Sequence, residues 1–315
     1  MDLASGTVIA LAPPVSTLAR PARFLLPHFF LQRFRSEQGS LEIISSFGTV
    51  NDIIPYGCAH LSSSLLRGIR EFSPGRMESV GQARRPLQLV SGAEGYTVIA
   101  SLPKNSTSFA VQAVEGGADA VMLNIDGDEG SSPNHFGSYE LHDAYINDVI
   151  STVSVPCGLF IGGGRLITDE YWERIMSSAF SFVEMYAHHM PTFVLSDKRV
   201  RKLTAISTGY ILEQVKQLSE MEGVEAVDVA TVPLQSRGAP FSVLDYATLG
   251  VIAKLSSKPV LLRTQKKLTR GDVSNVVALG IRGLVVDPCI LSGTDEAYKD
   301  EIESLSPRGR LAEEQ

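Results

Sequence analysis

Cysteine is scarce in this chain of 315 residues, which contains Cys58, Cys157 and Cys289 as its three cysteines. No two of them have the CxxC spacing of a metal or redox motif, and three cysteines cannot all pair within one chain. This pattern argues against a disulfide framework and against a structural zinc site. Unpaired cysteines are typical of a reducing compartment, so we expect a cytoplasmic protein.

Long hydrophobic runs and an excess of positive charge are also lacking. No stretch approaches the roughly 20 apolar residues that a membrane-spanning helix needs. The formal net charge is −7 at pH 7, and an acidic surface repels nucleic acids and anionic membranes, so we expect neither as a partner. A small anionic molecule stays compatible with this charge, because a local group of basic side chains can bind it. The sequence leaves open whether the protein is a homo-oligomer.

Lysine is absent from the first 103 residues, where every basic residue is arginine. Residues 1–76 are rich in serine and show no sustained helical or strand period, so we interpret them as an extension outside the folded domain. Three explanations are open: an organelle-targeting segment, a disordered extension, and a start codon assigned too early, with Met77 as the true first residue. Acidic residues such as Glu37 and Asp52 disfavour targeting, which leaves the early start as the preferred explanation. Residues 77–95 are expected to lead into the domain.

From Tyr96 onward, short apolar runs alternate with amphipathic segments, which is typical of parallel strands joined by helices. The runs that we predict as strands are Thr97–Leu102, Ala120–Ile125, Cys157–Ile161, Phe180–Ala187, Lys202–Ile206, Ala226–Ala230, Val260–Arg263 and Gly283–Val286. A helix is predicted after each strand except the fourth. Eight units predict a (β/α)8 TIM barrel over residues 96–310, followed by a tail at 311–315. An open doubly wound sheet is the alternative, but SLPKNS after the first strand is not the GxGxxG turn of that fold.

The strongest candidates for catalysis lie on the predicted fourth and sixth strands. Active sites of TIM barrels lie at the C-terminal ends of the strands, and alternate residues of a strand share a face. Glu184, Tyr186 and His188 therefore point the same way, and Asp228 faces the lumen if its flanking valines face the helices. We predict Glu184 or Asp228 as the general base and His188 as the partner acid, with Asp126 converging on them. The alternative for Glu184 is a buried ion pair.

Polar residues at the ends of the other predicted strands are candidates for substrate binding. They are Lys104, Asn124, Asp126, Arg165, Tyr186, Thr231, Arg263, Gln265 and Lys266. Lys104, Arg263 and Lys266 would hold an anion or stabilise an enolate, and the glycines before Arg165 offer an anion nest. The alternative for Lys266 is a solvated turn. The acidic residues are also compatible with a divalent metal, although their spacing identifies no ligand set. The polar loop at 126–138 is long enough to act as a lid.

The segment Lys258–Gly293 (KPVLLRTQKKLTRGDVSNVVALGIRGLVVDPCILSG) resembles the seventh and eighth units of the phosphate-binding TIM-barrel superfamily, the ribulose-phosphate-binding barrels. The resemblance implies a barrel whose backbone amides hold a phosphate at these two strand ends. Two departures weaken that cradle: Thr264-Gln265 replaces a glycine pair, and Asp287-Pro288 replaces Gly-Ser. Proline lacks an amide donor and aspartate repels phosphate, so FMN is disfavoured as a cofactor.

The function that these features favour is enzymatic. The substrate would be a small, phosphorylated or carboxylated carbonyl compound, and the reaction would be isomerisation, epimerisation or aldol-type cleavage. One alternative is a Schiff-base lyase with Lys104 or Lys266 as the nucleophile. Another is a barrel that binds a ligand or a partner without catalysis, which the loss of the phosphate-binding glycines supports.

Overall fold

The computed structural model describes residues 85–89, 95–127, 136–287 and 295–307. These residues belong to one compact unit of the chain, which spans Gly75–Gln315. Three of the sequence-based predictions therefore fall mainly outside the described residues: the extension at 1–76, the lid formed by the long polar loop, and the tail at 311–315. None of the described helices is long and apolar enough to cross a membrane.

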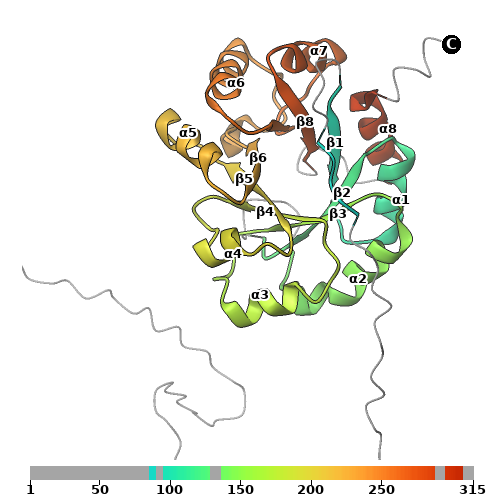
Figure 1. Cartoon of the computed structure of the whole chain (residues 1–315). Coiled ribbons are helices and arrows are strands. Elements are labelled where there is room, and N and C mark those ends of the chain that lie inside the picture. The colour runs from blue at the N-terminus through green and yellow to red at the C-terminus, as the bar shows by residue number, and fades with distance from the viewer. Residues whose placement is uncertain (1–84, 90–94, 128–135, 288–294, 308–315) are drawn as a thin grey trace, which may run out of the picture. The chain divides into compact units, whose positions relative to one another are not determined.

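Eight parallel strands form a closed barrel in which each strand pairs with the next in sequence and the last pairs with the first (Figure 1). The strands are β1 (Thr97–Ser101), β2 (Ala120–Ile125), β3 (Cys157–Ile161), β4 (Phe182–Tyr186), β5 (Arg201–Ile206), β6 (Val224–Val229), β7 (Val260–Arg263) and β8 (Ile281–Val286). The predicted (β/α)8 fold is confirmed. The alternative of an open sheet is wrong, because β8 returns to pair with β1 along four residue pairs.

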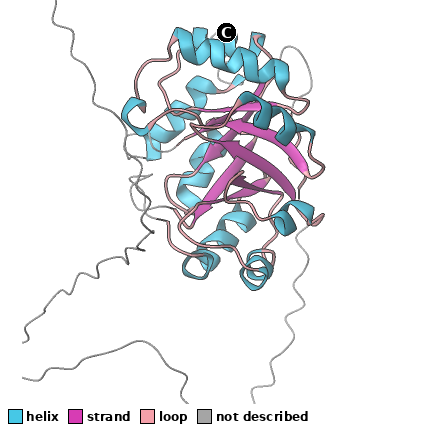
Figure 2. Cartoon of the chain, turned by 90° about the vertical axis from the view of Figure 1, so that its left-hand side faces the viewer, coloured by secondary structure: helices cyan, strands magenta, loops and turns pink. Residues whose placement is uncertain are grey.

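Helices surround the barrel on the outside (Figure 2). They are α1 (Thr107–Glu115), α2 (Tyr139–Thr152), α3 (Asp169–Ile175), α4 (Thr192–Ser196), α5 (Leu212–Glu220), α6 (Val243–Leu255), α7 (Arg270–Ala278) and α8 (Asp295–Leu305), with a short 3-10 helix η1 (Leu234–Ser236) before α6. Four of them begin at a hydroxyl side chain that accepts a hydrogen bond from a first-turn amide: Ser106, Thr168, Ser242 and Thr269. Such caps satisfy amides that the helix itself leaves without partners.

The fourth unit differs most from the sequence-based prediction. The strand is shorter than the predicted Phe180–Ala187, because the chain turns directly after Tyr186, whose carbonyl accepts from the amides of His189 and Met190. The helix α4, which the sequence did not predict, then begins after Pro191 and has five residues. A helix of this length is too short to show a hydrophobic period in the sequence.

Two apolar layers hold the barrel together. The outer faces of the strands pack against the helices, and the inner faces form a separate cluster in the lumen. Leu87, from the segment that precedes the barrel, is 1% exposed and belongs to the lumen cluster. Its carbonyl accepts a hydrogen bond from Arg201 Nη1 at 3.0 Å, at the first residue of β5. The lead-in segment therefore closes the N-terminal end of the lumen.

Candidate functional site

Three charged side chains meet inside the barrel. Glu184 lies on β4, Asp228 on β6 and Arg263 on β7. The residue two positions before each of them contributes to the lumen cluster, and residues two apart on a strand share a face. Both carboxyl side chains are 0% exposed, and Arg263 is 5% exposed. We call these three residues the lumen triad.

Arg263 bridges the two carboxyl groups of the lumen triad. Its Nε donates to Asp228 Oδ2 at 2.8 Å, and its Nη2 donates to Glu184 Oε1. The guanidinium carbon lies 5.0 Å from the ring centroid of Phe160. The second oxygens, Glu184 Oε2 and Asp228 Oδ1, are buried and have no hydrogen-bond partner. Because an unpartnered buried polar atom is costly, each of these oxygens has the capacity to bind a proton or a polar ligand group.

The charges of the lumen triad do not balance when both acids are ionised. Burial raises the pKa of Glu184 well above its ordinary value, Arg263 opposes this, and the neighbouring Asp228 carboxylate raises the pKa further. Burial disfavours the charge on Arg263, but the two carboxylates outweigh it and raise the pKa of the guanidinium. Burial and the neighbouring carboxylate therefore favour the protonated form of Glu184, which would remove one of the two negative charges of the site.

Two aromatic rings flank the triad: Phe160 is in register with Glu184 on the neighbouring strand, and Tyr186 lies two residues closer to the barrel mouth. Tyr186 is the next inward-facing residue after Glu184 on β4, and its ring packs edge-on against Phe160 at a centroid distance of 5.8 Å. Both residues are half-buried, whereas the triad beneath them is buried. Burial raises the pKa of Tyr186, with Arg263 opposing that shift. The phenol hydroxyl of Tyr186 thus remains protonated and can donate a hydrogen bond to a molecule that enters the mouth.

Asn124 faces the lumen but is held by its neighbours. Its Nδ2 donates to the carbonyl of Leu102 at 2.9 Å and to Ser101 Oγ at 3.2 Å. The Asn105 side chain donates to the Asn124 carbonyl through Nδ2 and accepts from the Asn124 amide through Oδ1. These bonds tie β1 to β2, so the described contacts give Asn124 a structural role. Sequence reasoning missed Asn105, because a polar residue in a turn carries no signal that distinguishes it from a solvated one.

Asp126 does not converge with the lumen triad, contrary to the sequence-based expectation. Its φ of 51° is the left-handed conformation, which breaks the alternation of β2. Its Oδ2 accepts from the Tyr171 hydroxyl at 2.7 Å, and Tyr171 belongs to the outer core between strands and helices. Burial raises the pKa of Asp126, while the hydrogen bond from Tyr171 lowers it. The side chain therefore serves the helical layer.

The structure also contradicts the prediction that the amides of the triple glycine bind an anion. The amides of Gly162 and Gly164 donate to backbone carbonyls at 2.9 and 3.0 Å, so they do not face a ligand. Arg165 lies outside the barrel, where it pairs with Glu140 at 3.3 Å and stacks 3.9 Å above the ring of Tyr171. The glycines are needed for close packing. A Cβ on Gly162 would collide with the backbone after β2.

Gly163 provides a test of this packing explanation. A Cβ at this position would overlap the imidazole of His189. We expect Gly163→Ala to lower the free energy of unfolding by about 1–3 kcal/mol, as overpacking does, and His189→Ala to recover part of that loss in the double variant. Urea unfolding measures both. Gly271→Ala is the control, because a Cβ fits at this position of α7, and it should leave the free energy of unfolding unchanged. Additive effects of the two substitutions would contradict the predicted contact.

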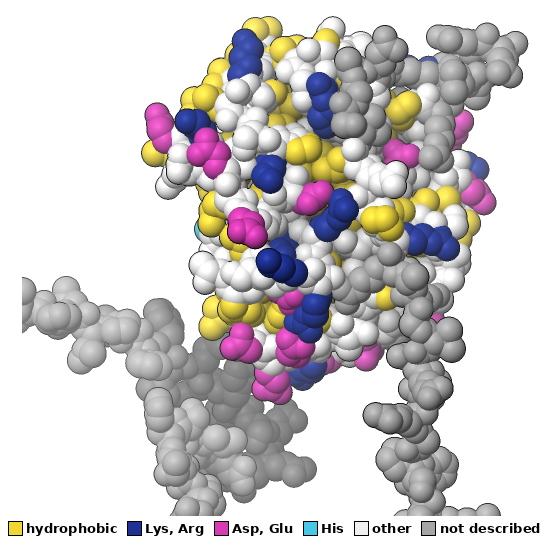
Figure 3. Space-filling view, viewed as in Figure 1, with side chains coloured by type: hydrophobic (Ala, Val, Ile, Leu, Met, Phe, Trp, Pro, Cys, Tyr) yellow, Lys and Arg dark blue, Asp and Glu magenta, His cyan; other side chains and the backbone are white. Residues whose placement is uncertain are grey.

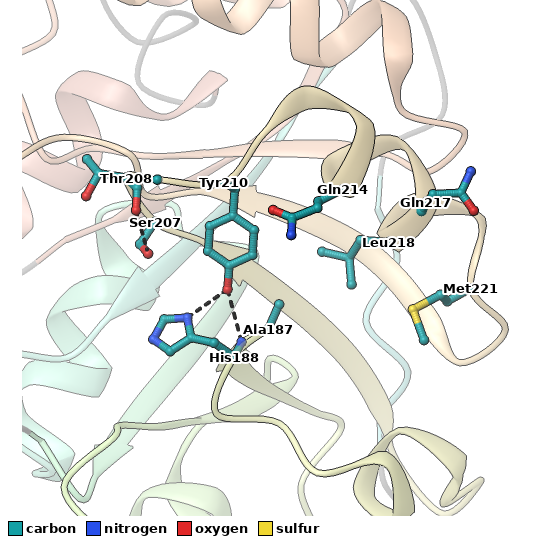
Figure 4. Close-up of a pocket in the computed structure, with 10 residues that line it drawn as sticks. Ala187, His188, Ser207, Thr208, Tyr210, Gln214, Gln217, Leu218 and Met221 are labelled. Carbon is teal, nitrogen blue, oxygen red and sulfur yellow. Dashed lines mark hydrogen bonds between the residues drawn. The ribbon is translucent and has the colours of Figure 1, made fainter. Parts of the chain in front are cut away.

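His188 lies outside the lumen, contrary to its predicted role as partner acid. It follows the end of β4 and is solvent-exposed. Its Nδ1 shares a hydrogen bond of 2.7 Å with the Tyr210 hydroxyl, which also accepts from the His188 amide at 3.0 Å (Figure 4). Its ring stacks on Tyr186 at a centroid distance of 5.6 Å. The ring of Tyr186 thus links His188 to the inner face of β4, on which Glu184 lies.

The loop after β7, where the resemblance places a phosphate, is occupied by protein contacts. Gln265 Oε1 accepts from the Val232 amide at 3.0 Å, and the Gln265 carbonyl accepts from Gly238. Lys266 Nζ is paired with Asp245 at 2.6 Å, so it is neither a solvated turn residue nor a free anion-binding group. The loop before α6 therefore covers this strand end. At the rim, Thr231 is half-buried and Lys104 is exposed.

Charge is mixed over the described residues on one face of the molecule. On the face shown in Figure 3, basic and acidic side chains are interspersed over the described residues instead of gathering into a patch of one sign. Among the described residues, no three His, Cys, Asp or Glu side chains lie close enough together to hold a metal ion.

No protein-family model matches the chain, and no curated protein is similar to it. Solved structures with a similar fold include two variants of the tryptophan synthase α-subunit from Pyrococcus furiosus, each with 15% sequence identity and a TM-score of 0.53. The matched region covers 67% of this chain and 97% of each α-subunit chain. A phosphoribosyl anthranilate isomerase from Thermus thermophilus has 14% identity and a TM-score of 0.49, covering 70% of this chain and 100% of its own. The likeness to the α-subunit shows the fold, a closed (β/α)8 barrel.

Proposed function

We propose that the protein is an enzyme that moves a proton on a small anionic carbonyl compound, with Glu184 and Asp228 as its acid–base pair. The observation that carries this proposal is the buried carboxyl pair around Arg263, in which one oxygen of each acid has no partner. Pairs of acids whose environments separate their protonation states are typical of acid–base sites. The similar fold of the tryptophan synthase α-subunit, which is part of an enzyme, supports a catalytic role.

The lumen triad can supply both halves of a proton shift. Ionised Asp228 would accept the proton from the carbon next to the carbonyl, and protonated Glu184 would give its proton to the carbonyl oxygen. On a substrate with a hydroxyl on that carbon, the product of this step is an enediol. Isomerisation is complete when Asp228 gives its proton to the former carbonyl carbon and Glu184 takes back a proton from the other hydroxyl, so that both acids return to their starting states. Return of a proton to the original carbon on its opposite face, with Glu184 recovering its proton from the enediol oxygen, would give an epimerisation instead. The sequence suggested that Arg263 holds the anionic group of the substrate, but Arg263 is engaged with the two acids, whose charge it stabilises. We assign that group to the rim of the mouth, where Lys104 is exposed.

Exchange of substrate hydrogen with solvent tests this function directly. Dihydroxyacetone phosphate and ribulose 5-phosphate are incubated with the protein in D2O, and loss of the proton signal is followed by NMR. We expect exchange with the wild type and a loss of about 10²–10⁴-fold in Glu184→Gln, because the amide cannot donate that proton. His188→Ala is the control, and it should retain most of the exchange because His188 lies outside the lumen. Equal exchange in Glu184→Gln and the wild type would refute the assignment.

A non-catalytic barrel is the second candidate function. The complete burial of both acids favours it, because a substrate can reach them only if side chains around them move. Under this alternative, no tested carbonyl compound exchanges, and substitutions in the triad change stability alone. The Schiff-base alternative has less support, because Lys104 is exposed and Lys266 is paired with Asp245, whereas Schiff-base lysines are desolvated and unpaired. Borohydride trapping with ketoacids would detect it.

A further inference from the structure

A pocket outside the barrel wall is separate from the lumen triad. It has a volume of about 670 Å3 and lies between the ends of β4 and β5 and the helix α5 (Figure 4). Ala187 and His188 come from the end of β4, and Ser207 to Tyr210 follow β5. The helix and the residue after it supply Gln214, Gln217, Leu218 and Met221. The volume is within the range of small-molecule sites.

The chemistry of the lining restricts the ligand. None of the described residues that line the pocket is a lysine, arginine, aspartate or glutamate. A charged ligand would lose hydration there without gaining a counter-charge, which is costly. The polar lining groups are hydroxyls, amides and one imidazole, and Leu218 and Met221 form an apolar wall. The lining therefore suits an uncharged molecule with one hydrogen-bonding edge and one apolar face.

Hydrogen bonds fix part of this lining in advance. Tyr210 holds His188 at both the backbone amide and Nδ1. Gln214 Oε1 accepts from the Ile211 amide at 3.3 Å, so its Nε2 is oriented away from that amide as a donor. A thioether packs well on an aromatic face, and a side-chain amide pairs well with the edge of a nitrogen heterocycle.

From this combination we propose that the pocket binds an uncharged planar nitrogen heterocycle, of the kind present in a nucleoside. The Nε2 donor of Gln214 and the amide oxygen of Gln217, whose Nε2 donates to Glu220 Oε2 at 3.1 Å, would bind its edge, and Met221 would contact its face. The Ser207 and Thr208 hydroxyls would bind its polar substituent. His188 stacks on Tyr186, so an occupied pocket adjoins the rings above the lumen triad without being part of the triad.

Calorimetric titration of the full chain with adenosine tests the proposal. We expect saturable binding, and we expect Gln214→Glu to weaken it at least tenfold. That substitution keeps the acceptor for Ile211 but removes the amide donor and adds a charge. Gln235→Glu is the matched control, because it makes the same change on the exposed helix η1 outside the pocket. Glu184→Gln should leave adenosine binding unchanged, so failure of the proposed enzymatic function would not affect this result.

Three outcomes would overturn the proposal. The first is the absence of saturable adenosine binding. The second is an equal loss of affinity in Gln214→Glu and Gln235→Glu, which would place the binding elsewhere. The third is tighter binding of adenosine 5′-monophosphate or of D-glucose than of adenosine, which would assign the pocket to a charged ligand or to a sugar.

Discussion

Replacement of Arg263 by methionine should lower the free energy of unfolding by about 3–5 kcal/mol, because it leaves a buried charge without its partner. Arg263 is the only basic side chain that the structure pairs with Glu184 or Asp228 among the described residues. Methionine fills a similar volume but offers no hydrogen bonds to either acid. Urea unfolding at neutral pH, followed by circular dichroism, measures the change.

Arg199→Met is the matched control for this measurement. Arg199 is solvent-exposed and pairs with Asp197 and Glu173, so the same substitution should cost about 1 kcal/mol or less there. The triple variant Glu184→Gln, Asp228→Asn, Arg263→Met should recover much of the loss, because no buried charge remains. If Arg263→Met costs no more than Arg199→Met, the lumen triad is not the coupled unit described above.

The second large effect concerns pH. Burial raises the pKa of Glu184 in the folded protein well above its ordinary value of 4.5, so folding retains a proton that the unfolded chain releases above that pH. The stabilisation by this proton is complete below pH 4.5 and is lost as the pH rises through the folded pKa. Glu184→Gln has no proton to lose. The stability of the wild type relative to the variant should therefore fall by up to about 1.4 kcal/mol per pH unit across this window.

Urea unfolding of both proteins at several values between pH 4 and pH 8 would test this expectation. The variant also tests the neutral state of Glu184, because glutamine resembles a protonated glutamate in shape and charge. Parallel stability curves for the two proteins would mean that Glu184 titrates alike when folded and unfolded. A difference that grows in favour of the wild type with rising pH would show a lowered pKa, opposite to the one that we infer.

The barrel could be predicted well from the sequence, because each strand–helix unit has its own local pattern and that pattern recurs along the chain. The runs at β2, β3 and β7 have the predicted bounds, since each is a buried apolar segment flanked by glycine, proline or polar residues. The helix α4 was missed, because five residues hold little more than one turn. Its position depends on the turn after Tyr186 and on Pro191, and neither feature specifies whether a helix follows.

The candidate site was predictable only where strand alternation holds. Glu184, Tyr186 and Asp228 lie within their strands, so the period of two placed them on the inner face correctly. Asp126 and His188 lie at the ends of strands, where one residue with a positive φ or one turn changes the direction of a side chain. The link between Glu184, Asp228 and Arg263 needs the closure of the barrel, which no local pattern contains.

The position of Leu87 has a consequence for where the folded domain begins. Because this side chain fills the bottom of the barrel, the hydrophobic interior includes residues that precede the first strand. A shortened protein starting at Met77 would keep the Leu87 side chain and the hydrogen bond from Arg201 to the Leu87 carbonyl. One starting at Tyr96 would admit water to the floor of the lumen, beneath Phe182 and Leu203, and would lose stability although all eight strands remained.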